Sequence, residues 1–317
     1  MSTRALRIVA WSSLLVLGVA APFLVYPVFA MNVLCLALFA SAFNLLLGYT
    51  GLLSFGHAAF LGSAAYVTGY TVRSWGFPPE LGVVAGTAVA TILGALFGSL
   101  AIRRSGIYFA MITLGFAQLV YFLVVQMPWT GGEDGLQGVP RGKALGILPL
   151  DHQLAMYYFV FAAFLAGFWL IERAIQSPFG HVLRAIRENE PRALSLGYDV
   201  ERYKLLAFVL SAALSGLAGS LKVLTLQFAS LTDVYWHRSG EVVLMTLLGG
   251  MGTVMGPSVG ALVVVWLENA LSGVGSWVTV ITGAVFVACV LAFRRGIVGE
   301  IRAVVRRSFV GAKPTAE

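Results

Sequence analysis

The feature that most constrains this chain is a near-unbroken succession of apolar runs, each about as long as a bilayer crossing. A helix of about 20 apolar residues spans the hydrocarbon core, and the charges of this sequence fall mainly in the short gaps between runs. Because lipid offers no partner to unpaired backbone groups, each run is expected to be a helix. Eight runs are long enough to span: residues 8–29, 30–48, 52–72, 80–102, 106–127, 153–172, 205–226 and 275–293.

A ninth apolar stretch, residues 241–272, is too long for one crossing and too short for two. Glycine-rich breaks interrupt it at residues 249–252 and 256–257. Glycine and proline weaken a helix, so we predict a re-entrant half-helix followed by an outward helix. The expected fold is an all-α polytopic integral membrane protein, with about eight transmembrane helices plus this half-helix, in a single transmembrane domain over residues 1–317.

Composition excludes a soluble protein, a disulfide framework and a cysteine-rich metal site. Hydrophobic residues make up 59% of the 317 residues and charged residues 11%, whereas soluble domains carry about 25% charged residues. The two cysteines, Cys35 and Cys289, both lie inside apolar runs. The net charge of +7 has two interpretations, nucleic-acid binding or basic cytoplasmic loops, and the positions of the basic residues decide between them.

The basic residues gather on one side of the predicted topology. With the N-terminus in the cytoplasm, the inner side receives Arg4, Arg7, Arg103, Arg104, Arg173, Arg184, Arg187, Arg192, Arg202, Lys204, Arg294, Arg295, Arg302, Arg306, Arg307 and Lys313. The outer side receives Arg73, Arg141, Lys143, Lys222 and Arg238. This asymmetry agrees with the positive-inside rule, so we expect cytoplasmic N- and C-termini, a cytoplasmic basic tail over residues 294–317, and no nucleic-acid partner.

Residues 8–29 are expected to be an uncleaved first helix kinked by Pro22 and Pro27.

The chain lacks the sequence signatures of an ATPase, a metalloenzyme and a proton-coupled carrier. No phosphate-binding loop occurs, since Gly142-Lys143 is followed by Ala144, so any ATP energy must come from a partner. The four histidines fall in separate segments without metal-ligand spacing, and we expect no metal, no cofactor and no catalytic residue. Only Glu268 and Lys222 are ionisable within spans, which weakens proton coupling and leaves sodium coupling through backbone carbonyls open.

The longest charged inner segment, residues 173–204, is predicted to form two short helices parallel to the membrane. The first runs from Pro178 to Asn189, and the second covers about six residues from Pro191, with Gly197 just after its end. A rigid short helix of this kind fits a groove on a cytoplasmic protein. The alternative is a solvated loop with ordinary positive-inside charge.

The candidate contacts to such a cytoplasmic protein combine apolar anchors with flanking charges. They are Arg187, Glu188, Glu190, Arg192, Leu194, Leu196 and Gly197. The two leucines are the anchors and the two arginines are polar guides. The glutamates lie at the N-terminal flank of the second helix, where negative charge suits the helix dipole.

Five stretches of the sequence together cover most of the chain. They are SPFGHVLRAIRENEPRALSLGYDVERYKLLAFVLSAALSGLAGSL from Ser177, GYTGLLSFGHAAFLGSAAYVTGY from Gly48, RRSGIYFAMITLGFAQ from Arg103, TGGEDGLQGVP from Thr130, and LLGGMGTVMGPSVGA near the end. These stretches resemble the permeases of branched-chain amino acid importers of the ABC class, and they are similar to the M-type subunit of that family. The inner loop resembles the family's EAA-type coupling loop. Its spacing from Glu190 to Gly197 is seven residues where the family pattern has six, which leaves open which glutamate is equivalent.

The resemblance implies partners and a location. In that family two different permeases pair, two cytoplasmic ATPases dock beneath them, and a periplasmic binding protein delivers the substrate from above. The resemblance implies a multi-pass protein of the bacterial cytoplasmic (inner) membrane, surrounded by lipid, that imports branched-chain or related hydrophobic amino acids and is not itself an enzyme. Relatives that move urea, amides or aromatic acids leave the substrate open. A stand-alone secondary transporter of small organic solutes is the alternative.

The candidate substrate pathway gathers polar groups around two glycine-broken segments, Gly48–Tyr70 and Leu247–Gly260. Its candidate residues are Asn44, Gly51, Ser54, His57, Tyr66, Thr113 and Gly250. A zwitterion must meet dipoles near mid-membrane, and hydroxyls, amides and glycine-freed backbone supply them. The alternative is tight helix packing, with His57 bonded to a neighbouring helix. The two segments occupy roughly corresponding places in the two halves, which hints at an inverted repeat.

The outer loop, residues 128–152, concentrates Glu133 and Asp134 between glycines. The family's binding protein would dock on this side, and acidic loops often dock basic rims. The alternative is a surface turn that the glycines shape, with the acids solvated. A calcium loop is excluded because it would need more oxygen ligands at alternating positions.

Overall fold

The computed structural model describes residues 3–144, 146, 148–274, 277–292 and 296–300. The longer helices are α1 (Thr3–Leu24), α2 (Pro27–Thr50), α3 (His57–Ser74), α4 (Pro79–Ala101), α5 (Gly106–Gln126), α6 (Gln153–Gln176), α9 (Val200–Leu226), α10 (Trp236–Gly249), α11 (Gly256–Leu271) and α12 (Trp277–Ala292). The shorter helices are α7 (Pro178–Glu188), α8 (Glu190–Ser195), and the 3-10 turns η1 (Pro128–Thr130), η2 (Gly132–Asp134), η3 (Leu231–Asp233) and η4 (Ser272–Val274). Two antiparallel pairs of short strands are β1 (Leu136–Gln137) with β4 (Phe228–Ala229), and β2 (Lys143–Ala144) with β3 (Leu148–Pro149).

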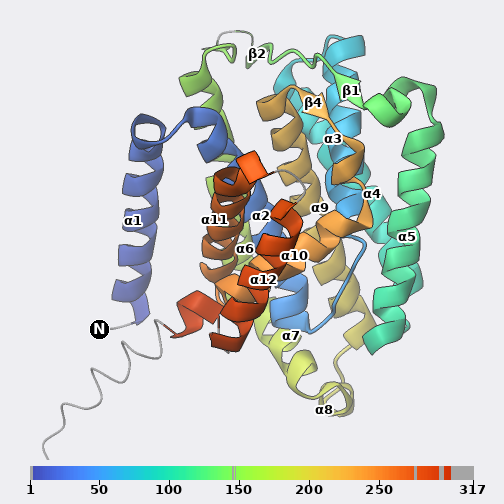
Figure 1. The fold of residues 1–317 in the computed structure, drawn as a ribbon. Helices are drawn as coiled ribbons and strands as arrows, with labels where there is room; N and C mark the ends of the chain where they lie inside the picture. Colours follow the sequence, from blue (N-terminus) through green and yellow to red (C-terminus); the bar gives the residue numbers. More distant parts are fainter. Residues whose placement is uncertain (1–2, 145, 147, 275–276, 293–295, 301–317) are drawn as a thin grey trace, which may run out of the picture.

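The predicted all-α membrane fold is confirmed. The eight spanning runs correspond, in chain order, to α1, α2, α3, α4, α5, α6, α9 and α12. Among the described residues, α2, α4, α5, α6 and α9 are long and apolar enough to cross a bilayer, and Leu14–Leu24 and Gly256–Leu271 are shorter apolar helices. Figure 1 shows the helices packed side by side, with α1 and α5 on opposite flanks.

The predicted single kinked helix at the start of the chain is wrong at Pro27. Pro22 does lie inside α1, but that helix ends at Leu24 and Pro27 occupies the first turn of α2. Tyr26, before the proline, has φ −55° and ψ 125°, an extended conformation that a following proline favours. Proline is well suited to the first helical turn because its missing N–H needs no partner there. Pro27 therefore starts a second helix instead of bending the first.

The core of the bundle lies around α2 and α9. In the most apolar stretch of each helix, 83% of the α2 residues and 72% of the α9 residues are buried, against 33% for α5. A helix that is apolar on all sides packs inside, and α2 contacts α6, α9 and α11. The outer helix α5 turns Ile107, Met111 and Phe122 outward. Such a face suits lipid, which is as apolar as these side chains.

Small residues let α3, α4 and α9 approach closely. A Cβ atom added at Gly219 of α9 would meet the carbonyl oxygen of Leu61 in α3. One added at Gly216 would meet Ala90 in α4. Close backbone approach and dispersion hold helices together in lipid, where burial from water supplies no force. These three helices therefore form the most tightly constrained part of the bundle.

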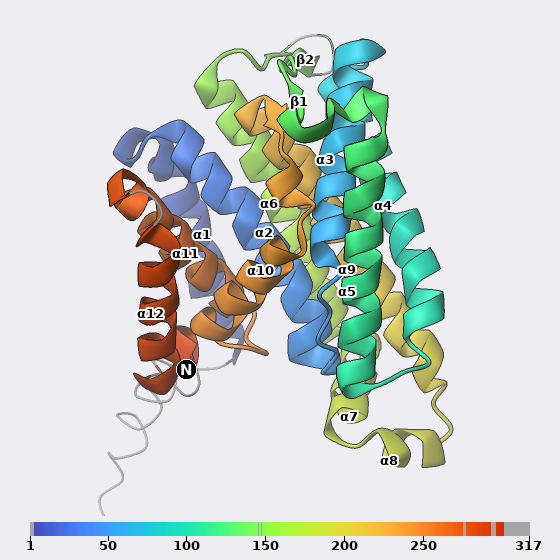
Figure 2. The ribbon, with the colours of Figure 1, turned by 45° about the vertical axis from the view of Figure 1, so that its right-hand side comes forward.

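The predicted re-entrant half-helix and outward helix are α10 and α11. After β4 the chain turns back through η3 into α10, which crosses the bundle obliquely (Figures 1 and 2). Residues 250–255 form a turn between the two helices. A Cβ atom at Gly249 would meet the carbonyl oxygen of Gly256, and one at Gly260 would meet that of Met245. This close contact requires glycine on both helices. The inverted repeat remains a prediction.

The connections divide between the two ends of the bundle (Figure 1). α7, α8 and the link between α4 and α5 at residues 102–105 lie at one end, which we call the α7 end. The described residues of the loop after α5 (127–144, 146 and 148–152) and the two strand pairs lie at the opposite end. The charged loop between α6 and α9 and the acidic loop after α5 therefore face opposite sides of the bundle.

Candidate functional site

The segment between α6 and α9 forms two short helices, as its prolines and glycine predict. α7 ends at Glu188, one residue earlier than expected, because Asn189 leaves the helical conformation and caps α8. The Asn189 Oδ1 atom accepts a hydrogen bond from the Arg192 N–H at 3.0 Å. Gly197 follows α8 with φ 85°, the left-handed conformation that commonly ends helices. The side chains of Glu188 and Arg192 are exposed.

We call residues 190–197 the stub, and it is fixed on one side and open on the other. Ala193 packs into a small apolar cluster between α7 and α9. Glu190 forms an ion pair with the buried Lys204 of α9 at 2.6 Å. On the open side, Leu194 and Leu196 are 56% and 70% exposed. The stub therefore presents two unpartnered leucines on a rigid base.

Arg187, another predicted contact for a cytoplasmic protein, reaches toward the bundle. Its Nη1 atom donates a hydrogen bond to the Gly48 carbonyl oxygen near the end of α2. Gly51 ends α2 with φ 80°, and a Cβ atom there would lie 3.1 Å from Arg187 Cγ. A Cβ atom at Gly252, in the turn between α10 and α11, would lie 3.4 Å from Arg187 Nη1. One side chain thus brings α7, the end of α2 and the re-entrant turn together.

Asn44 holds the re-entrant turn against α2. Its Nδ2 atom donates to the Thr253 carbonyl oxygen and its Oδ1 atom accepts from the Gly252 N–H, both at 2.9 Å. One amide side chain therefore satisfies two backbone groups of an irregular segment. A Cβ atom at Gly48 would meet Asn44 Oδ1 and lie 2.8 Å from Gly252 N. We call this site the junction, and it consists of Asn44, Gly48, Arg187, Gly252 and Thr253.

Ser54 and Thr113 support the bend between α2 and α3. Thr113 Oγ1, on α5, accepts a hydrogen bond from the Phe55 N–H at 3.1 Å. Ser54 Oγ accepts one from the Gly56 N–H at 3.1 Å. Both side chains are buried, and they satisfy backbone donors that lie outside the helices. In Figure 2 the bend runs along the lower half of α5, from the end of α2 up toward the start of α3.

His57 and Tyr66 are enclosed within the helix packing of α3. His57 Nε2 forms a hydrogen bond with Ser211 Oγ of α9 at 2.8 Å. The aromatic rings of Phe43, Phe60 and Phe208 surround the imidazole. Tyr66 is fully buried, and its hydroxyl has no hydrogen-bond partner among the described residues.

The pathway candidates do not form one cluster. They fall in three places: Asn44, Gly51 and Gly250 beside the re-entrant turn, Ser54, His57 and Thr113 around the start of α3, and Tyr66 further along that helix. All of them except Gly51 are buried in this chain.

A buried ionic network that the sequence did not predict lies at the other end of α10. Asp233 of η3 pairs with Lys222 of α9, and with Arg238 of α10 at 3.3 Å. Arg238 also pairs with Glu241. The side chains of Lys222 and Asp233 are only 7% and 5% exposed. Lys222, an ionisable residue within a predicted span, was a visible signal, but its partner Asp233 lies outside the predicted spans. We call these four residues the ionic anchor.

Glu133 and Asp134 lie in η2, on the surface of the end opposite α7. Gly131 and Gly135 flank them with φ 80° and φ 71°. A Cβ atom at Gly135 would meet the carbonyl oxygen of Ala229, where β1 runs beside β4. The glycines therefore shape the turn, and both acids are exposed. Their contact with a binding protein remains a prediction.

Comparison with known proteins places the chain among permeases. It is 29% identical over 273 residues to the high-affinity branched-chain amino acid transport system permease protein LivM of Escherichia coli (strain K12), covering 76% of this chain and 63% of that protein. It is 28% identical over 201 residues to the autoinducer 2 import system permease protein LsrC of Klebsiella pneumoniae, covering 58% and 53%. It is 32% identical over 173 residues to the ribose import permease protein RbsC of Bacillus subtilis, covering 52% and 51%.

The chain thus spans less than two thirds of the length of these relatives. No solved structure matches it. The model of one family, described as branched-chain amino acid transport system / permease component, matches residues 28–292, which run from α2 to the end of α12. Because the match covers most of the chain and its helical bundle, the chain belongs to the family of permease components of branched-chain amino acid transport systems.

Proposed function

We propose that the chain is the membrane-spanning permease subunit of an ATP-driven importer of branched-chain or related hydrophobic amino acids. Family membership and the similarity to LivM support this function. The sequence has no phosphate-binding loop, so ATP hydrolysis falls to two partner ATPases, which dock at α7 and α8. A second permease subunit completes the membrane domain. A substrate-binding protein docks at the opposite end, at Glu133 and Asp134.

The contact of Arg187 with the end of α2 carries the proposal. The stub offers Leu194 and Leu196 to an ATPase groove, while Arg187 on the preceding helix touches the junction. Movement of the stub therefore reaches the re-entrant turn through one side chain. Because packed helices shift between discrete arrangements, a small displacement here switches α10 and α11 between inward- and outward-facing positions.

The substrate pathway follows the re-entrant turn and the bend before α3. Gly51 and Gly250 give access to backbone, and Asn44, Ser54 and Thr113 supply polar groups for a zwitterion. The histidine of α3 is assigned to helix packing, because aromatic rings enclose it. The partner permease supplies the facing wall of the pathway.

Reconstitution tests the function directly. The chain and its partner permease are placed in liposomes with and without the ATPases, and uptake of labelled leucine is measured with ribose and urea as competitors. We expect uptake only when ATPases and ATP are present, and displacement by other branched-chain amino acids but not by ribose or urea. Uptake without ATPases would support the stand-alone transporter instead.

The α7 end is proposed to face the cytoplasm, together with both chain termini, in the bacterial inner membrane. The excess of basic residues on that side supports this orientation. Cysteines placed at Glu133 and at Ser195 are expected to react with an impermeant thiol reagent from opposite sides of the membrane. If both cysteines react from the same side, either the loop after α5 or the segment between α6 and α9 has been assigned to the wrong side of the membrane.

A further inference from the structure

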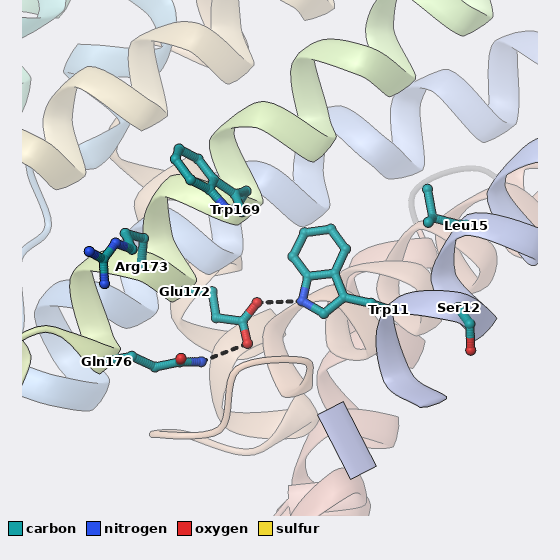
Figure 3. A pocket seen from close by; sticks show the side chains of 7 residues that line it. All are labelled: Trp11, Ser12, Leu15, Trp169, Glu172, Arg173 and Gln176. Atoms are coloured by element: carbon teal, nitrogen blue, oxygen red, sulfur yellow. Dashed lines mark hydrogen bonds between the residues drawn. The ribbon is translucent and has the colours of Figure 1, made fainter. Parts of the chain in front are cut away.

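A pocket of about 500 Å3 lies between α1 and the last turns of α6 (Figure 3). Its lining residues are Trp11, Ser12 and Leu15 from α1, and Trp169, Glu172, Arg173 and Gln176 from α6. The pocket lies at the α7 end, because α7 begins immediately after α6. The apolar part of α6 ends here, so the pocket sits at the depth where lipid headgroups meet the hydrocarbon.

Glu172 gives the pocket a desolvated negative group. The residue is 9% exposed, and it accepts hydrogen bonds from Trp11 Nε1 and, at 2.7 Å, from Gln176 Nε2. It forms no ion pair with any residue that the structure describes. An ionised carboxylate removed from water needs an opposite charge, and its oxygens keep further lone pairs for a donor. A ligand cation with N–H groups would meet both needs.

The other residues that line the pocket suit the phosphate and the apolar part of a lipid whose headgroup carries such a cation. Arg173 is exposed, forms no ion pair among the described residues, and is turned away from the carboxylate (Figure 3). A guanidinium matches the geometry of phosphate oxygens. The indoles of Trp11 and Trp169 attract cations over their faces and prefer the membrane interface. Leu15 and Val19 of α1, 42% and 50% exposed, continue the surface with apolar side chains.

We propose that this pocket binds a phospholipid whose headgroup carries a primary ammonium group, as phosphatidylethanolamine does. The ammonium donates to Glu172, the phosphate accepts from Arg173, and the acyl chains lie along α1. A choline headgroup fits less well because its ammonium has no N–H to donate. The lipid fills the seam between α1 and α6 and fastens α1 to the bundle.

Lipid binding to the purified full-length chain in detergent tests the site. Short-chain lipids with ethanolamine, choline or glycerol headgroups are titrated, and dissociation constants are measured by native mass spectrometry. We expect the ethanolamine lipid to bind about tenfold or more tightly than the other two, since a hydrogen bond to a buried charge is at stake. Within the wild type, each methyl group added to the ethanolamine nitrogen should weaken binding. Equal constants across this methyl series would overturn the proposal.

Variants assign the two contacts. Glu172→Gln should remove the preference for ethanolamine while leaving the glycerol lipid unchanged. Arg173→Gln should weaken all three lipids by a similar factor, and Arg103→Gln, an exposed arginine at the same end, should weaken none. A Glu172→Gln protein that keeps the ethanolamine preference would overturn the assignment. Displacement of the lipid by an equal concentration of free phosphoethanolamine would identify a site for a soluble amine instead.

Discussion

The two ends of α10 are held by opposite kinds of contact. At its start, the ionic anchor ties α10 and η3 to α9 through buried charges. At its end, the junction ties the turn to α2 through one amide side chain and backbone groups, with glycines at the closest approach. Breaking a buried ion pair costs about 3–5 kcal/mol, whereas a neutral hydrogen bond contributes about 0.5–1.5 kcal/mol.

From this difference we infer that the start of the re-entrant helix is its fixed end and that the turn after it is its movable end. A charge in the anchor cannot leave its partner without being stranded in a medium that solvates it poorly. The hydrogen bonds of the junction can be exchanged for others at small cost. Arg187, which lies on α7 just before the stub, touches the junction at this movable end. On this inference, α10 pivots at the ionic anchor when the turn at its other end moves.

The largest effect is expected from breaking the anchor. Asp233→Asn leaves Lys222 without its buried partner, and stability should fall by about 3–5 kcal/mol, with low yield and a lowered thermal midpoint. The matched control is Asp199→Asn, which breaks the exposed pair with Arg202 and should cost less than about 1 kcal/mol. Equal thermal midpoints for the two variants would remove the distinction between anchor and surface pair.

The next largest effect is expected from changes in the stub. These should weaken the docking of the ATPases without lowering the stability of the chain. Leu194→Asp or Leu196→Asp should weaken ATPase binding by about 2 kcal/mol or more, because a charge replaces an apolar anchor in a groove. Copurification with the ATPases and leucine uptake should both be lost, while the thermal midpoint stays near wild type. Ser195→Asp places the same charge on the same helix and should retain docking. Normal copurification of the leucine variants would move the ATPase contact elsewhere.

A smaller effect on stability is expected from opening the junction. Asn44→Ala leaves the Gly252 N–H and the Thr253 carbonyl without their side-chain partner, which should cost about 1–3 kcal/mol. ATPase docking should persist, and transport per ATP hydrolysed should fall. The ratio of uptake to phosphate release in proteoliposomes measures this coupling. An unchanged ratio would mean that the turn between α10 and α11 does not help to couple ATP hydrolysis to transport.

The smallest effect on stability is expected from Arg187→Gln, about 1 kcal/mol, because the side chain is partly in solvent. The ratio of uptake to phosphate release should nevertheless fall as far as in Asn44→Ala, because the variant removes the contact between α7 and the junction. Arg104→Gln, at an exposed position in the link between α4 and α5 at the same end of the bundle, is the control for loss of one positive charge. If both arginine variants couple equally well, the stub moves the bundle through another contact.

Local features of the sequence predicted most of the architecture. Helix positions follow from apolar runs, and the stub follows from Pro191 and Gly197, whose preferences act within a few residues. The error at Pro27 has the same local origin. A proline in an apolar run either bends a helix or begins a new one. Here Tyr26 leaves the helical conformation, so Pro27 begins a new helix.

The contacts of the candidate site depend on residues far apart in the chain. Asn44 binds a turn more than 200 residues away, at sequence separations of 208 and 209, and Arg187 reaches a carbonyl at a separation of 139. No periodicity or spacing in the sequence marks such pairs. Lys222 was conspicuous as a cation within a predicted span, but its partner Asp233 follows a strand and a turn whose course the hydrophobic pattern does not describe.

The strand pair β1–β4 joins the loop at the end of the bundle opposite α7 to the segment that leads into α10. β1 follows the acidic turn of η2, and β4 immediately precedes η3 and the ionic anchor. Backbone hydrogen bonds across this ribbon are reinforced by the Val139 N–H, which donates to the Gln227 carbonyl at 3.0 Å. Glu133 is therefore separated from the ionic anchor at the start of α10 only by this ribbon and η3, while Arg187 contacts the α2 end beside the turn that follows α10. The two ends of α10 are thus connected to opposite ends of the bundle, one through the β1–β4 ribbon and the other through Arg187.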